Sequence, residues 1–213
     1  MPEKYSLETV QNVYSYWGKS LFFYKSGVSF FGYYSYLTKK AVQALELKEG
    51  DTILDLACGP GLIFPLLQQK IGPKGRLIGV DYVPEMLHHC QTQIKKRGWK
   101  NVLLLNEDAA KLNLTPNSLD GIISIIGLSA IPDYQKTIKL CRQFLKPGGK
   151  IVILDGKNAK SKFINTLLKF FRWSKSYQQT DLIAELKKTF PQLTVKEYLF
   201  GTTFLAVAKK DSV

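Results

Sequence analysis

Ile53-Leu-Asp-Leu-Ala-Cys-Gly-Pro-Gly61 is the stretch that decides the fold predicted by this sequence. Its first residues are apolar, as in a buried β-strand, and include one acid, Asp55, before a turn that contains Gly59 and Gly61. Open α/β sheets bind their ligands at the carboxyl ends of parallel strands, which is where this turn would lie. The sequence therefore predicts a ligand site that presents a carboxylate and backbone N–H groups.

The turn differs from the glycine motif of dinucleotide-binding proteins. That motif, G-x-G-x-x-G, has a third glycine, and Phe64 stands at its position here. A carboxylate four residues before the first glycine would also repel a pyrophosphate. We therefore expect a ligand with a cationic group near Asp55. An NAD-dependent oxidoreductase is the alternative, because Asp81 lies about twenty residues beyond the turn, like the ribose-binding acid of that class.

Strand and helix signals alternate along the chain, as a parallel sheet with crossover helices requires. Near the end, residues 194–200 and 203–209 alternate apolar and polar side chains about Gly201, which predicts a hairpin. We find no repeat and no linker, and we expect one domain over residues 1–213. The predicted strands are 52–56, 76–80, 102–105, 121–125 and 150–154, and the predicted helices are 62–69, 84–97 and 134–144.

Composition excludes several classes of protein. A chain of 213 residues with 45% hydrophobic residues is long and apolar enough to form a full core, which excludes a disordered protein. No apolar run reaches the roughly 18 residues that span a bilayer, and no signal-like segment follows the first residues. The three cysteines have neither disulfide nor metal spacing. We therefore expect a cytoplasmic protein without a metal.

Four ordered segments resemble the motifs of the class I S-adenosylmethionine-dependent methyltransferases. They are 53–61, Leu77-Ile-Gly-Val-Asp81, Asn106-Glu-Asp108-Ala109, and the turn 144–150 before the apolar run 151–154. The resemblance implies an α/β fold with a doubly wound, mostly parallel seven-stranded sheet and a C-terminal antiparallel hairpin, which is the Rossmann-like methyltransferase fold. It also implies S-adenosyl-L-methionine as the cofactor and S-adenosyl-L-homocysteine as its product.

The same resemblance implies roles for single residues. Asp81 would accept hydrogen bonds from both ribose hydroxyls, and Asp108 would accept one from the adenine amine. The backbone N–H of Ala109 would reach a ring nitrogen of the adenine. The expected cofactor-binding residues are Asp55, Gly59, Gly61, Asp81, Asp108, Ala109 and Ile125.

The region after the fourth predicted strand bears on the methyl acceptor. Residues 127–133, the turn 72–75 and the Asp-Leu-Ala-Cys-Gly stretch resemble the ubiquinone/menaquinone-biosynthesis methyltransferases. Phospholipid and small-amine N-methyltransferases share much of this pattern. Ser129 follows Gly-Leu here in place of a basic residue, which is a departure from the quinone group. We therefore expect a small or lipid-like acceptor, either an amine or a phenol or quinol.

An aromatic segment precedes the first predicted strand, with eleven aromatic residues among the twenty-three of 14–36. In the family resembled, this part of the chain folds over the cofactor as a lid, which excludes water and positions the acceptor. We expect residues 1–48 to form a helical lid, and Tyr16, Tyr24 and Leu128 to line the acceptor pocket. For any single ring, the alternative is that it packs a helix on the sheet.

Residues 157–177 form a second unusual segment. It carries six basic and no acidic residues, interleaved with apolar residues at helical spacing. Such a basic amphipathic insertion is typical of a helix at an anionic membrane surface, and a lid helix over the active site is the equal alternative. The net charge of +13 favours the membrane surface, and so we expect peripheral membrane contact. Nucleic acid is not expected, since Ser124-Ile-Ile-Gly stands where an Asn- or Asp-Pro-Pro-aromatic motif would.

No catalytic residue is predicted, and the sequence gives no indication of the oligomeric state. Methyl transfer from a sulfonium depends mainly on proximity and a dry, oriented cleft. Tyr24 and Asp133 are candidate acceptors of a proton, but nothing in the sequence places either. His88 and His89 fall on a predicted helix, where solvated or packing roles are expected. A non-catalytic protein that binds the cofactor and acts as a partner is a further alternative.

Overall fold

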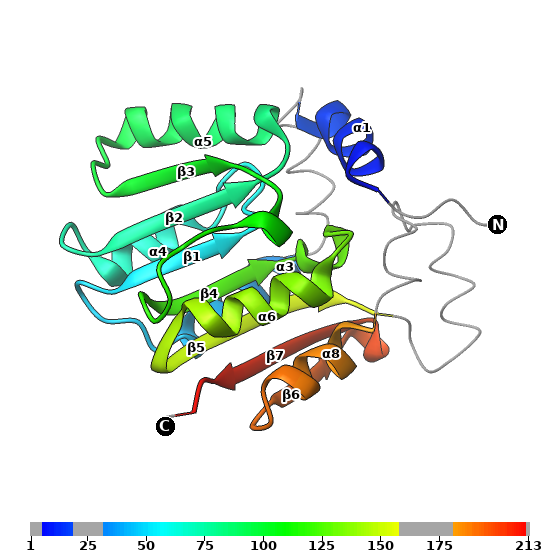
Figure 1. Cartoon of the computed structure of the whole chain (residues 1–213). Helices are drawn as coiled ribbons and strands as arrows, with labels where there is room; N and C mark the ends of the chain where they lie inside the picture. Colours follow the sequence, from blue (N-terminus) through cyan, green and yellow to red (C-terminus); the bar gives the residue numbers. More distant parts are fainter. Residues whose placement is uncertain (1–5, 19–31, 158–180, 212–213) are drawn as a thin grey trace.

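A mixed sheet of seven strands organises the part of the chain that the structure describes. The computed structural model describes residues 6–18, 32–157 and 181–211 (Figure 1). The strands lie in the order β3-β2-β1-β4-β5-β7-β6. In chain order they are β1 (Thr52–Leu56), β2 (Arg76–Asp81), β3 (Val102–Asn106), β4 (Leu119–Ile125), β5 (Leu145–Gly156), β6 (Thr194–Tyr198) and β7 (Thr203–Lys209).

The pairing of the strands confirms the predicted fold. Strand β1 pairs in parallel with β2 and β4, β2 with β3, and β4 with β5. Strand β7 is antiparallel to both β5 and β6, so the sheet ends in the expected hairpin. The strand order reverses between β1 and β4, and a doubly wound sheet opens a crevice at the carboxyl ends of the strands beside such a reversal.

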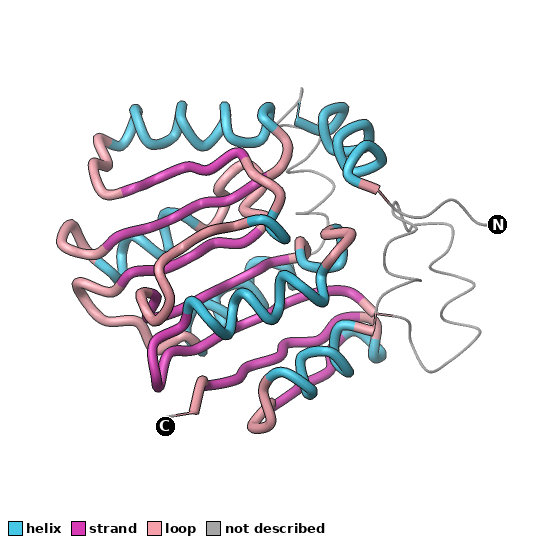
Figure 2. Tube along the Cα trace, in the orientation of Figure 1, coloured by secondary structure: helices cyan, strands magenta, loops and turns pink. Residues whose placement is uncertain are grey.

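Helices cover both faces of the sheet. Figures 1 and 2 show α6 and α8 on one face and α3 and α4 on the other. Each face has its own buried apolar cluster, represented by Ile122 and Leu186 on the first and by Ile53 and Leu67 on the second. The helices are α1 (Leu7–Gly18), α3 (Gly32–Ala44), α4 (Phe64–Ile71), α5 (Pro84–Arg97), α6 (Tyr134–Phe144) and α8 (Leu182–Thr189), with short 3-10 turns η1 (Ala109–Lys111), η2 (Leu128–Ala130) and η4 (Leu199–Gly201).

Several predicted bounds agree with the structure, and the differences have local causes. Elements β1, α5, α6 and β7 have the predicted bounds. Helix α5 ends at Gly98, which is left-handed (φ 67°) and donates its N–H to Ile94 O and Lys95 O. Helix α4 begins at Phe64 rather than at residue 62, because the glycine turn occupies the preceding residues. Strand β5 begins at Leu145 rather than at 150, and its register with β4 shifts after Leu145 pairs with Leu119.

Two features near the C-terminus were not predicted. Helix α8 is new, and it begins at Asp181, whose carboxylate accepts a hydrogen bond from the N–H of Ala184. The strand predicted for 194–200 stops at Tyr198, because Leu199 and Phe200 turn with φ of 49° and 55°. None of the helices in the described ranges is long and apolar enough to cross a bilayer.

Candidate active site

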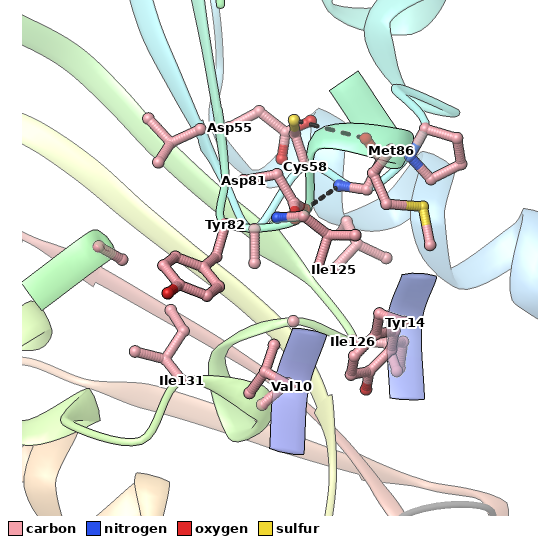
Figure 3. A pocket seen from close by; sticks show the side chains of 18 of the residues that line it. Val10, Tyr14, Asp55, Cys58, Asp81, Tyr82, Met86, Ile125, Ile126 and Ile131 are labelled. Atoms are coloured by element: carbon pink, nitrogen blue, oxygen red, sulfur yellow. Dashed lines mark hydrogen bonds between the residues drawn. The ribbon is translucent and has the colours of Figure 1, made fainter. Parts of the chain in front are cut away.

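A cleft opens at the carboxyl ends of β1, β2 and β4 (Figure 3). The glycine turn after β1 forms its floor, α1 and α3 contribute one wall, and the loop after β4 contributes another. Its position is the one predicted for the ligand site of this sheet. The lining residues are Leu7, Val10, Tyr14, Tyr34, Asp55, Ala57, Cys58, Gly59, Pro60, Leu62, Ile63, Val80, Asp81, Tyr82, Val83, Met86, Glu107, Asp108, Ala109, Ile125, Ile126, Gly127, Ala130, Ile131 and Pro132.

Asp81 holds the glycine turn in place. Its carboxylate accepts a 2.7 Å hydrogen bond from the N–H of Gly59 through Oδ2 and a 2.9 Å hydrogen bond from the N–H of Val83 through Oδ1 (Figure 3). Burial raises the pKa of Asp81 to about 6, although these hydrogen bonds oppose the shift. Each oxygen keeps a second lone pair, so the carboxylate can still accept from two ligand hydroxyls.

Asp55 is the second acid of the cleft. Its side chain is buried, and Oδ2 has no hydrogen-bond partner. Burial, with a contribution from Asp81, raises the pKa of Asp55 well above its usual range. A buried carboxylate oxygen without a partner is costly, and a cationic ligand group would satisfy it. The geometry thus agrees with the cation predicted beside Asp55.

The two glycines of the turn differ in position. Gly59 lines the cleft, whereas Gly61 does not. Gly61 has φ of +70°, its carbonyl accepts a hydrogen bond from Gln93 Nε2, and a Cβ there would meet Cys90 Sγ and Phe64 Cδ2 at 3.0 Å. Gly61 is therefore required for packing the turn against α4 and α5, and its expected contact with the ligand stays a prediction.

The predicted adenine-binding residues lie together. Asp108, Ala109 and Ile125 line the cleft with Asp55 and Asp81. Asp108 caps η1, since its Oδ1 accepts from the N–H of Ala110 at 3.0 Å. Five predicted cofactor side chains and Gly59 thus converge on one cavity.

The predicted acceptor residues are not brought together. Tyr16 has an exposed fraction of 73%, and Leu128 is 1% exposed within the core. Neither lines the cleft, and their assignment to the acceptor pocket stays a prediction. Tyr24 lies outside the described residues. Asp133, one candidate base, caps α6 by accepting from the N–H of Lys136 at 3.2 Å and does not line the cleft.

The loop after β4 supplies a wall of the cleft that sequence reasoning missed. Ile126, Ile131 and Pro132 line the cleft. Ser129 lies in the same loop and fixes it through hydrogen bonds to Asp155. Ser129 donates to the buried carboxylate of Asp155 through its N–H (3.0 Å) and its hydroxyl (2.8 Å). Ile126, Ile131 and Pro132 lie close to the Gly127-Leu128 pair already noted in the sequence. Their position beside this pair could have indicated that they line the cleft.

The cysteines pack around the turn without a disulfide. Cys58, Cys90 and Cys141 are buried free thiols. Cys58 and Cys90 both donate to the carbonyl of Gly59, at 3.6 and 3.2 Å. Burial raises the pKa of the Cys58 thiol, which keeps it protonated and unreactive.

A comparison with known families identifies the class of protein to which this chain belongs. The sequence model of the ubiE/COQ5 methyltransferase family matches residues 6–195. The chain belongs to this family. It is therefore an S-adenosylmethionine-dependent methyltransferase, and the expected cofactor stands, as does the prediction of an enzyme. The unpaired Asp55 oxygen suits the cofactor's ammonium group, and the Asp81 carboxylate suits its ribose.

Relatives of this ubiE/COQ5 family member are similar over most of its length. The demethylmenaquinone methyltransferase of Bacillus velezensis is 28% identical over 183 residues, which cover 81% of this chain and 78% of that protein. The enzyme of the same name from Anoxybacillus flavithermus is 25% identical over 197 residues, covering 81% and 83%.

Solved structures share the fold at lower identity. An S-adenosylmethionine-dependent methyltransferase from Aquifex aeolicus superposes with a TM-score of 0.66 and 19% identity, over 97% of this chain and all of that one. A Haemonchus contortus phosphoethanolamine N-methyltransferase, solved with phosphomonomethylethanolamine and S-adenosylhomocysteine, gives 0.67 and 18%, over 83% of this chain and 52% of that one.

Two acids, the half-buried Asp81 and the buried Asp155, make the stability of this methyltransferase depend on pH. Burial raises the pKa values of Asp81 and Asp155 from 3.8 to about 6. The folded state thus binds protons more tightly than the unfolded state, and this stabilisation, complete below about pH 4, is lost as the pH rises through 6. Each group accounts for about 3 kcal/mol. We expect the unfolding free energy of the ligand-free protein to fall between pH 4.5 and 7.5 in urea titrations.

The variant Asp155→Asn provides the control for this pH dependence. It should reduce the slope of the unfolding free energy against pH, because one of the titrating groups is gone. A wild-type free energy that rises steadily over the same range would contradict the assignment.

Proposed function

We propose that this enzyme methylates a lipid-like quinol, of the kind named by its demethylmenaquinone methyltransferase relatives. One observation carries the choice of acceptor. Among the described residues that line the cleft, all four charged ones are acids, and they lie on the β1, β2 and β3 side: Asp55, Asp81, Glu107 and Asp108. The described lining on the β4 side is uncharged and includes Ile126, Ile131 and Pro132. An apolar ring fits this half, and the acids repel a phosphorylated amine.

The proposed division of the cleft assigns the cofactor to the acidic half. We propose that Asp81 accepts from the ribose hydroxyls, that Asp108 accepts from the adenine amine and that the N–H of Ala109 donates to the adenine ring. Ile125 would pack beside the cofactor at the end of β4. The bound cofactor supplies a methyl group already activated on a sulfonium.

The residues of this chain then act mainly by holding and enclosing the reactants. Val10 and Tyr14 of α1 and Ile131 of the β4 loop wall off the uncharged half, which excludes water and fixes the acceptor ring. Figure 3 shows these three side chains gathered around the space opposite Asp81. Methylation of the acceptor would release one proton from the acceptor. Asp133 is a poor candidate to receive it, since its carboxylate already caps α6.

A direct assay tests the acceptor. Purified enzyme is incubated with S-adenosylmethionine and either detergent-solubilised demethylmenaquinone, reduced with dithionite, or phosphoethanolamine. Mass spectrometry measures the methylated product, and S-adenosylhomocysteine is quantified in parallel. We expect methylation of the reduced quinol alone. Turnover of phosphoethanolamine with none of the quinol would overturn the proposal.

We further propose that the acceptor is met at an anionic membrane surface. The support is the net charge of +13 and the six basic residues of the segment 157–177. Positions 158–177 of this segment lie outside the described residues. Each basic residue near such a surface contributes about 1 kcal/mol. Sedimentation with vesicles should show binding that grows with phosphatidylglycerol content and weakens with salt. If the enzyme ignores these vesicles at low salt, the segment is better interpreted as a lid.

A further inference from the structure

The turn between β6 and β7 exposes two large apolar side chains. Phe200 is 87% exposed, which makes it the most exposed of the large apolar residues that the structure describes, and Leu199 beside it is 41% exposed. Single exposed apolar residues are ordinary on protein surfaces, whereas two at the tip of one turn form an apolar projection. We call this projection the Leu199–Phe200 turn.

The backbone of this turn is unfavourable for the residues that occupy it. Leu199 and Phe200 have φ of 49° and 55°, in the left-handed region where a Cβ crowds the carbonyl that follows. Thr202 fixes the turn by donating two hydrogen bonds to Leu199 O, one of 3.1 Å from its N–H and one of 2.7 Å from its hydroxyl. Glycine or asparagine would adopt this backbone more easily. A strained turn that presents apolar side chains to water indicates a role in binding.

The Leu199–Phe200 turn lies at the edge of the sheet where the cleft opens. Thr203, which begins β7, pairs with Gly156 at the carboxyl end of β5. Strand β5 is parallel to β4, and β4 to β1, so their carboxyl ends share this edge. In Figure 1 the turn and α1 both lie on the side toward which the arrows of β1 and β2 point. The other strongly exposed ring, Tyr16 (73%), belongs to α1.

The basic segment 157–177 begins beside this turn. The N–H of Lys157 donates to Thr202 O at 2.9 Å, so the chain leaves β5 next to the turn. The segment carries six basic and no acidic residues. Lys196 on β6 is exposed, and the nearby acid Glu197 is ion-paired with Lys157. The sequence thus places its most basic stretch directly after a residue that is hydrogen-bonded to the apolar turn.

An apolar projection beside a basic stretch matches the interface of an anionic bilayer. Anionic headgroups attract Lys and Arg within about a Debye length, and apolar side chains then enter the boundary between headgroups and acyl chains. One such contribution alone gives weak attachment, and two together hold a protein at the surface. A second copy of this chain fits less well, because each copy carries a net charge of +13 and the two would repel.

We propose that the Leu199–Phe200 turn is the apolar anchor that inserts into an anionic lipid bilayer. This inference rests on the membrane contact proposed above, and it adds the inserting residues and the orientation. Because the turn and the cleft share one edge of the sheet, insertion turns the cleft toward the lipid. A lipid-like acceptor then enters the cleft from the bilayer without crossing bulk water.

Replacing Phe200 with asparagine tests the anchor. Vesicles of phosphatidylcholine, with and without phosphatidylglycerol and free of any quinone, are sedimented with the full-length enzyme. We expect Phe200→Asn to bind the phosphatidylglycerol vesicles about ten-fold more weakly than the wild type, because apolar burial in the bilayer is lost. Its melting temperature should equal or exceed that of the wild type, since asparagine tolerates the left-handed backbone. Its affinity for S-adenosylhomocysteine should be unchanged.

A matched control moves the aromatic ring to the other edge of the sheet. Gln192 is exposed in the turn before β6, and this end of β6 lies opposite to the end that pairs with Thr203. The double variant Phe200→Asn/Gln192→Phe has the same net charge as the wild type and regains a phenylalanine. It should bind vesicles as weakly as Phe200→Asn. Recovery of wild-type binding would overturn the proposal, since it would show that the place of the ring does not matter.

A fluorescent label reports insertion directly. The three native cysteines are buried, so a thiol-reactive NBD group can be placed on Phe200→Cys and, as the control, on Gln192→Cys. With phosphatidylglycerol vesicles, we expect emission from position 200 to shift to shorter wavelength and to be quenched by nitroxide-labelled lipids. The label at position 192 should show neither change. Equal responses at the two positions would overturn the proposal.

The outcomes separate this inference from the proposals on which it rests. Wild-type binding that Phe200→Asn leaves unchanged would overturn the anchor and leave the membrane contact standing. A wild type that ignores the vesicles would overturn both. A dimer that Phe200→Asn dissociates in sedimentation velocity, without any response to vesicles, would assign the turn to contact between copies and overturn the anchor. The quinol assay is independent of all three, because these vesicles contain no acceptor.

Discussion

Replacing Asp81 with alanine is expected to weaken the binding of S-adenosylmethionine and S-adenosylhomocysteine by about a hundred-fold or more. The reason is the loss of two proposed hydrogen bonds to the ribose, each worth about 1.5–3 kcal/mol when one partner is charged. The variant also frees the N–H groups of Gly59 and Val83, which the carboxylate now holds at 2.7 and 2.9 Å. Isothermal titration calorimetry gives both dissociation constants.

Asp120→Ala is the matched control for Asp81→Ala. Asp120 is also a half-buried acid of the sheet, and it accepts from the N–H of Thr52 (2.8 Å) and from Lys146 Nζ (2.7 Å). These bonds join the start of β1 to β4, at the opposite end from the cleft. Its removal should lower the melting temperature and leave cofactor affinity unchanged. A dissociation constant for Asp81→Ala equal to that of the wild type would exclude Asp81 from the ribose site.

Gly127→Ala is expected to damage both stability and cofactor binding. A Cβ at Gly127 would lie 2.7 Å from Ala57 Cβ and 3.0 Å from Ala57 O, closer than atoms pack. The loops after β1 and β4, both of which line the cleft, would have to move apart. Overpacking of this kind costs about 1–3 kcal/mol. Urea denaturation should show that loss, and cofactor affinity should fall by about ten-fold.

A second substitution tests the cause of this damage. Ala57 has φ of +53°, an unfavourable region for a residue with a Cβ. Ala57→Gly alone should leave the protein as stable or slightly more so, because it relieves this strain. In the Gly127→Ala background it also removes the closest clashing atom and should recover much of the lost stability. Additive losses in the double variant would show that the two loops do not clash at this point.

The fold could be predicted where local signals and tertiary packing agree. Helix α5 begins at Pro84 and ends before Gly98, and both ends follow from backbone chemistry. The bounds of β5 could not be predicted, because its extra residues pair with β4 through a register shift that only the assembled sheet provides. Helix α8 had a detectable signal: Asp181 at its N-cap precedes Leu182, Leu186 and Phe190 at four-residue spacing.

In the site, as in the fold, some residues could be predicted from the sequence and others could not. The acids of the cleft could be predicted because each lies at or just beyond the carboxyl end of a parallel strand, and parallel strands bring these ends to one edge. Tyr34 was hidden among eleven aromatic residues, since sequence alone does not show which rings point into a cleft. The contact between Ser129 and Asp155 joins residues 26 apart in the chain. The expected lid of residues 1–48 stays a prediction, although Val10 and Tyr14 do line the cleft.

The attachment of α1 has a kinetic consequence for this enzyme. Val10 of α1 is buried against Val83 and Met86, with Tyr14 packed beside them, and these four residues also line the cleft. Burying a side chain of this size is worth about 1.5–3 kcal/mol. We therefore expect this cluster to open far more often than the whole sheet unfolds. Each round of catalysis must exchange spent cofactor for fresh. We expect undocking of α1 from this cluster to offer a route for that exchange, so that enlarging the apolar contact would slow product release.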